Sequence, residues 1–153
     1  PLWSAFTEAY VKKDFIWIRN IIKKMLIVFV FWILVGGIML IGSNTIYGLW
    51  TGMELNIPYS LSAVVYLFML TCCWNGIFIA FINGIGKIQL QVLLSILPIL
   101  LMLPLSKLLI SVFHFGVTGI VLCMLLFNII SSLMISIQVW KILRGTDRGI
   151  WAK

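Results

Sequence analysis

The residues best placed to take part in chemistry are four polar side chains that interrupt long uncharged apolar runs: Asn75, Asn128, Ser131 and Gln138. A polar side chain inside lipid is costly unless it faces protein or water. Our main interpretation is hydrogen bonding between helices, to which Ser132 and Ser136 add a contact between small residues. The alternative is that the four side chains line a polar cavity through which a substrate crosses a membrane.

Two prolines, Pro98 and Pro104, fall within a single apolar run. Each removes a backbone hydrogen bond from a helix and crowds the preceding turn, so this run is expected to bend. A fixed kink and a moving hinge are both compatible with the pattern. Pro98 and Pro104 are therefore the candidate hinge residues.

Patterns typical of nucleotide binding or catalysis are incomplete. The run Gly84-Ile85-Gly86-Lys87 is similar to the end of a phosphate-binding loop, but Phe81 stands where the first glycine belongs and Ile88 where Ser or Thr belongs. A turn is the favoured interpretation. His114 is the only histidine, and it has no Ser, Cys or carboxylate spaced to form a triad.

The acids and cysteines also argue against an enzyme. All four acids lie outside the apolar runs, at Glu8, Asp14, Glu54 and Asp147. Three cysteines lie inside those runs, without a Cys-x-x-Cys pair or a nearby histidine: Cys72, Cys73 and Cys123. We expect these cysteines to act as small buried apolar residues. The sequence therefore predicts no catalytic residue, no cofactor site and no metal site.

The composition indicates a membrane protein. Of 153 residues, 63% are hydrophobic and only 10% are charged, against roughly 45–50% and about 25% in a soluble domain. A soluble fold of this length cannot hide so much apolar surface, because a compact domain still exposes about a third of its unfolded area. Lipid is the solvent in which that surface carries no penalty.

Four segments reach the roughly 20 apolar residues that a helix needs to cross a bilayer. They cover about 21–42, 60–82, 88–108 and 116–140, and they predict an all-α, polytopic transmembrane helix bundle. Asp14 is expected to cap a helix that begins at Phe15. The turn-forming residues of 42–59, and the glycine-rich run 83–87, predict non-helical connections.

Basic residues predict the orientation. Ten of the eleven fall on one side of the four spans, and Lys107 alone falls on the other. Lys and Arg accumulate in cytoplasmic loops, so the basic tail (141–153) is expected in the cytoplasm, after a four-helix transmembrane region at 21–140. Residues 1–20 are expected to be the end of a preceding helix plus a junction on the same side, in the cytoplasm or at the membrane interface. These charges flank spans rather than form a soluble domain, so topology and anionic lipid explain them better than nucleic acid does.

Several motifs, in order along the chain, resemble one family of transporters. The run 1–10, PLWSAFTEAY, and the following Lys13-Asp14-Phe15-Ile16-Trp17-Ile18 resemble the cytoplasmic junction after the eighth helix of Wzx-type polysaccharide flippases. These belong to the multidrug/oligosaccharidyl-lipid/polysaccharide exporter superfamily. Three later runs are similar to turns or helix entries of that family: Leu49-Trp50-Thr51-Gly52, Asn83-Gly84-Ile85-Gly86-Lys87 with the nearby Gln89, and Phe115-Gly116-Val117-Thr118-Gly119.

The resemblance covers nearly the whole chain and implies the last third of a two-lobe transporter of about twelve helices. It implies that the chain is a fragment of a flippase, which carries undecaprenyl-pyrophosphate-linked oligosaccharide repeat units across the bacterial inner membrane for surface polysaccharides such as O-antigen or capsule. Its partners would be the lipid-linked oligosaccharide, membrane lipids and the polysaccharide polymerase machinery. No site of the family maps securely onto a residue of this chain.

Two other functions fit the same segments. A multidrug cation antiporter of the same superfamily would need intramembrane carboxylates, which these spans lack. A small four-helix membrane subunit that scaffolds another protein is a rival from a different class.

Overall fold

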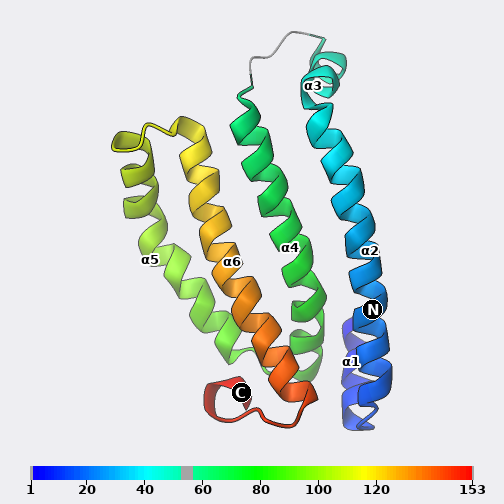
Figure 1. Ribbon diagram of the computed structural model, residues 1–153. Helices are drawn as coiled ribbons and strands as arrows, with labels where there is room; N and C mark the ends of the chain where they lie inside the picture. Colours follow the sequence, from blue (N-terminus) through cyan, green and yellow to red (C-terminus); the bar gives the residue numbers. More distant parts are fainter. Residues whose placement is uncertain (1, 53–56, 153) are drawn as a thin grey trace.

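The computed structural model describes residues 2–52 and 57–152, and it places most of them in helices (Figure 1). The described elements, in chain order, are α1 (Leu2–Val11), α2 (Phe15–Ile41), α3 (Ser43–Thr51), α4 (Tyr59–Ile85), α5 (Gln89–Ser111), α6 (Gly116–Leu143) and the 3-10 helix η1 (Gly149–Ala152). The predicted all-α class is confirmed.

Within the described residues, four helices are long and apolar enough to cross a membrane: α2, α4, α5 and α6. They correspond to the four predicted spans and support a membrane protein. Each helix extends beyond its predicted span at one end or at both, because the helical backbone continues past the apolar run. The prediction for the start of α2 is confirmed, since the Asp14 carboxylate accepts a hydrogen bond of 3.0 Å from the Trp17 backbone N–H.

Two expected connections are shorter than predicted. Residues 83–85 are the last turn of α4, and Gly86 ends the helix with a left-handed φ of 74°. Residues 43–51 form α3 rather than a loop. Their turn-forming residues are tolerated because the Tyr47 hydroxyl bonds with that of Ser62, at 3.0 Å, and so ties α3 to α4. Glu54 and Asn56, also within the expected loop, lie outside the described residues.

The four long helices lie side by side in the order α2, α4, α6, α5 (Figure 1). Helix α4 packs on both α2 and α6, and α5 packs on α6. Helices α4 and α5 diverge from the turn that joins them, with α6 between them. This is an open row rather than a closed bundle, so it leaves broad apolar faces exposed.

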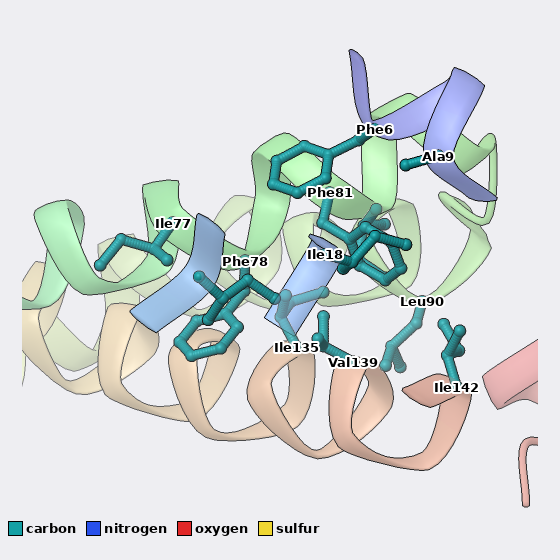
Figure 2. Close-up of a cluster of buried hydrophobic side chains, with 12 residues drawn as sticks. Phe6, Ala9, Ile18, Ile77, Phe78, Phe81, Leu90, Ile135, Val139 and Ile142 are labelled. Atoms are coloured by element: carbon teal, nitrogen blue, oxygen red, sulfur yellow. The ribbon is translucent and has the colours of Figure 1, made fainter. Parts of the chain in front are cut away.

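The best-packed region lies at one end of the row, where α1 lies against α4 and α2 (Figure 2). Phe6 of α1 is fully buried, with its ring edge-to-face against Phe81 of α4, at 5.4 Å between centroids. Ile18 of α2, Leu90 of α5 and Val139 of α6 join the same cluster. Helix α1 is thus part of the hydrophobic core.

The same end of the row carries most of the positive charge. It brings together the N-terminal end of α2, the α4–α5 turn and the C-terminal end of α6 (Figure 1). Nine basic residues among those described lie in these segments or beside them: Lys12, Lys13, Arg19, Lys23, Lys24, Lys87, Lys141, Arg144 and Arg148. Lys107, near the C-terminal end of α5, lies toward the opposite end.

Candidate functional site

A polar groove of about 320 Å³ lies where α4 and α5 diverge over α6. Helix α4 contributes Asn75, α5 contributes Gln91 and Ser95, and α6 contributes Asn128 and Ser131. The remaining lining side chains are apolar: Phe68, Leu94, Pro98, Met102, Met124 and Phe127. Three of the four predicted polar residues therefore share one site.

Helical spacing explains how one groove collects these side chains. On α5, Gln91, Ser95, Pro98 and Met102 recur at intervals of four and three residues, so they lie on a single face of the helix. On α6, Asn128 and Ser131 share a face for the same reason. Neither helix has to distort to present its polar side chains to the groove.

Hydrogen bonds between α4 and α6 run along the edge of the groove. The Asn75 amide donates to the Asn128 side-chain oxygen at 3.5 Å and to the Ser131 hydroxyl at 3.3 Å. The Asn128 amide donates to the Cys72 sulfur at 2.8 Å. Asn75, Asn128 and Ser131 thus bond between helices, as the main sequence interpretation predicts.

The two serines of the predicted small-residue contact also join α6 to α4. The Ser132 hydroxyl donates to the Thr71 carbonyl at 3.3 Å, and the Trp74 indole N–H donates to the Ser136 hydroxyl at 3.0 Å. Small side chains let the helices approach closely enough for these bonds to form. These hydrogen bonds hold together α4, which forms one side of the groove, and α6, which forms its floor.

Two amide oxygens in the groove are left without a donor. The side-chain oxygens of Asn75 and Gln91 are buried, and neither has a hydrogen-bond partner among the described residues. Leaving a buried acceptor unpaired costs roughly 1–3 kcal/mol. Because both side chains line the groove, a hydrogen-bond donor from a ligand, from water or from another protein segment would remove this cost.

The two candidate hinge residues differ in position. Pro98 lines the groove, whereas Pro104 lies beyond it with an exposed side chain. Helix α5 continues through both prolines, and its axis changes direction along its length (Figure 1). In that view α5 leans away from α4 over its first half and turns back toward parallel over its second half, so the divergence that opens the groove begins before the bend.

Gln138 lies apart from the groove, at the basic end of α6. Its side chain is fully buried and donates to the backbone carbonyls of Lys87, at 3.1 Å, and Trp151, at 3.4 Å. Lys87 also forms a 2.5 Å ion pair with Asp147. Gln138 therefore joins the C-terminal segment to the α4–α5 turn.

The electrostatic environment of Lys87 favours its charged form. Burial alone would lower the pKa of Lys87, but the hydrogen bonds and charges of Asp147 and Tyr10 outweigh it and raise that pKa above its ordinary value. The Lys87 ammonium also lies 5.7 Å from the centre of the Tyr10 ring. One lysine thus connects α1, the α4–α5 turn and the C-terminal segment.

The sequence interpretation missed Gln91 and Ser95. Their four-residue spacing, continued by Pro98 and Met102, is the signal that places them on one face of α5. Gln91 lies close to the start of the predicted span, where a polar residue is readily interpreted as facing the membrane–water interface.

The groove is uncharged, so it suits neutral hydrogen-bonding ligands better than proton or metal chemistry. Its polar groups are three amides and two hydroxyls, and no acid, base or histidine lines it. Across the described part of the chain, no three His, Cys, Asp or Glu side chains come together as metal ligands.

Comparison with protein-family models, with curated proteins and with solved structures finds no significant match to this chain.

Proposed function

We propose that this chain forms part of a flippase that moves undecaprenyl-pyrophosphate-linked oligosaccharides across the bacterial inner membrane. In this proposal the polar groove contacts the oligosaccharide during its passage. The observation that carries the proposal is the pair of buried, unpaired amide oxygens, Asn75 Oδ1 and Gln91 Oε1, in an uncharged groove.

Sugars match this groove chemically. Each sugar ring carries several hydroxyls, which donate hydrogen bonds that unpaired amide oxygens can accept. The apolar lining offers Phe68 and Phe127, against which the carbon faces of sugar rings can pack. A groove without charges lets a neutral glycan leave as readily as it enters.

The open row of helices also supports the proposal that this chain is one part of a larger transporter. Sites in repeat-built transporters lie between two halves that move against each other. Here α4 and α5 form the sides of the groove and α6 forms its floor, and no described residue covers its mouth. The motifs that resemble Wzx-type flippases imply a second lobe in that position.

The rivals fit the groove less well. A cation antiporter uses carboxylates to exchange its substrate for ions, and none lines this groove. A four-helix scaffold has no need of unpaired acceptors, since an apolar seam would bind a partner helix without their cost.

The direct test compares two glutamines two residues apart. Gln91 lines the groove, and Gln89 is exposed outside it. In a strain lacking its own polysaccharide flippase, the gene that carries Gln91→Leu should restore much less surface polysaccharide than the unmodified gene. Gln89→Leu should restore it fully, with equal protein abundance in the membrane.

Two outcomes would contradict the proposal. The first is full restoration by a gene that carries both Asn75→Leu and Gln91→Leu. The second is failure of the unmodified gene to restore polysaccharide, combined with efflux of a cationic dye by the same cells, which would favour the antiporter.

A further inference from the structure

A second groove, of about 440 Å³, lies between α2 and α4, and its lining is almost entirely apolar. Met25, Val28 and Trp32 of α2 form one side, and Cys73 and Gly76 of α4 form the other. It shares no lining residue with the polar groove. Such an apolar lining suits contact with the hydrocarbon of a membrane.

Gly76 keeps this groove open. A Cβ built on Gly76 would meet no atom within 4 Å, whereas one on Gly84 would lie 2.7 Å from the Trp3 carbonyl oxygen. Gly84 is small because α1 packs against it, and no packing neighbour explains Gly76. Glycine inside a helix is less favourable than alanine, so the empty space at Gly76 suits an occupant that is not among the described residues.

The groove's length fits a lipid chain from one leaflet. Its lining on α2 runs from Ile21 to Trp32, which is about 16 Å along the helix axis at about 1.5 Å per residue. Half of a bilayer's hydrocarbon core is about 15 Å thick. The groove is therefore long enough for an extended acyl chain from the leaflet at the basic end.

One positive charge marks the headgroup end. Lys24 is the charged residue of the lining, and it forms no ion pair among the described residues. The described acids are engaged elsewhere: Glu8 with Lys12, Asp147 with Lys87, and Asp14 at the start of α2. A lysine in this position can bury its apolar stem along the groove while its ammonium reaches the membrane surface.

From these features we propose that the α2–α4 groove binds one anionic phospholipid of the surrounding membrane. An acyl chain fills the space beside Gly76, and the lipid phosphate pairs with the Lys24 ammonium. Asn20, one helical turn before Lys24 and exposed, lies on the same face and can donate a further hydrogen bond to the headgroup. This site does not depend on the proposed transport function.

The test uses photoreactive lipids in membranes that contain the full protein carrying this sequence. Phosphatidylglycerol and phosphatidylcholine with the same diazirine-bearing acyl chain are added, each at the same mole fraction, to phosphatidylcholine vesicles. After illumination, mass spectrometry maps the labelled peptides. One charge near the surface contributes about 1 kcal/mol, so phosphatidylglycerol should label residues 21–32 and 73–77 about fivefold more than phosphatidylcholine does.

Two matched pairs of variants locate the effect. Lys24→Gln should abolish the preference for phosphatidylglycerol, whereas Lys23→Gln, which removes an adjacent exposed charge outside the lining, should preserve it. Gly76→Leu should reduce labelling of the groove by both lipids. Gly48→Leu in α3, where a Cβ also meets open space, should not.

Three results would overturn the proposal. Equal labelling of the groove by the two lipids would remove the headgroup specificity. Equal effects of Lys23→Gln and Lys24→Gln would reduce the preference to general surface charge. Absence of groove labelling by either lipid would mean that a protein segment covers the groove. The lysine variants keep the test valid even if Gly76→Leu fails to fold, since both side chains are exposed.

Discussion

At the scale of single residues, the two glycines of α4 are small for different reasons. Gly84 accommodates α1, whose Trp3 carbonyl and Phe6 side chain approach to 2.7 Å and 3.0 Å of a Cβ placed there. The Thr7 hydroxyl also donates a 2.5 Å hydrogen bond to the Gly84 carbonyl. Gly76 faces the open apolar groove. The same substitution should therefore have opposite effects at the two positions.

We predict that Gly84→Ala destabilises the protein by about 1–3 kcal/mol, because backbone atoms of α1 must move to relieve the clash. Gly76→Ala should stabilise it by about 0.5–1 kcal/mol, because alanine favours the helix and meets no neighbour. Thermal unfolding in detergent would measure both changes. A loss of stability at both positions would mean that Gly76 is also a packing contact.

At the scale of elements, the C-terminal segment is anchored to the helical row. Gln138 bonds to the Trp151 carbonyl, Lys87 pairs with Asp147, and the Lys141 ammonium lies 4.1 Å from the centre of the Trp151 ring. On the other side of α6, the Arg19 guanidinium donates to the Leu143 carbonyl at 2.8 Å. The basic tail is therefore a packed element where it is described.

We predict that Asp147→Asn releases this segment. The Lys87–Asp147 pair is mostly buried, with side chains 18% and 17% exposed, and a hydrogen bond between charged groups contributes about 1.5–3 kcal/mol. Trypsin should cut after Arg144 and Arg148 several-fold faster in the variant. Glu8→Gln breaks the exposed pair with Lys12 and is the control. Equal cleavage of Asp147→Asn and the unmodified protein would show that Gln138 and Trp151 hold the segment without the ion pair.

The pH dependence of this anchor follows from the raised pKa of Lys87. A lysine whose pKa is higher in the folded state contributes stability that is complete below its ordinary pKa and is lost as the pH rises through the folded value. We therefore predict an alkaline transition: Lys87 should hold the C-terminal segment equally well between pH 6 and 9, and this contribution should be lost only above the ordinary lysine pKa of about 10.4. Trypsin cleavage after Arg148, normalised to a flexible peptide at each pH, would reveal release at a lower pH if this sign were wrong.

At the scale of the whole molecule, the charge distribution predicts the orientation in the membrane. Val11, at the basic end, and Leu49, in α3 at the other end, are similarly exposed, at 76% and 82%. In a background without native cysteines, Leu49→Cys should react with a membrane-impermeant thiol reagent in intact cells. Val11→Cys should react only after the inner membrane is permeabilised. The reverse pattern would invert the orientation and contradict a cytoplasmic basic end.

The open row also predicts what residues 1–153 do when expressed alone. Four helices of one lobe cannot expose a site alternately to the two sides of a membrane, because alternating access requires a second half that moves against the first. We therefore expect no surface polysaccharide in a flippase-deficient strain that expresses this segment alone. Restoration by this segment would refute the proposal that it is one part of a larger flippase.

Part of this architecture is predictable from the sequence, and the limits have identifiable causes. The four spans follow from apolar runs, and the start of α2 follows from Asp14, whose role depends only on the residues that come directly after it. Helix α3 was not predictable, because Asn44 and Gly48 disfavour a helix locally, and the hydrogen bond between Tyr47 and Ser62 joins two residues whose proximity the sequence does not show.

The sequence by itself determined three properties of this protein: a membrane environment, the number of long helices and the end of the molecule that carries most of the positive charge. These properties depend on composition averaged over about 20 residues. The tertiary structure alone decided which side chains meet. Gln91 and Asn75 line the same polar groove, and Gln138 anchors the C-terminal segment. Gly76 faces an apolar groove, whereas Gly84 packs against α1. The physical reason is that these helices are apolar on nearly every face, so no polar stripe records how each is rotated or which neighbour it packs against.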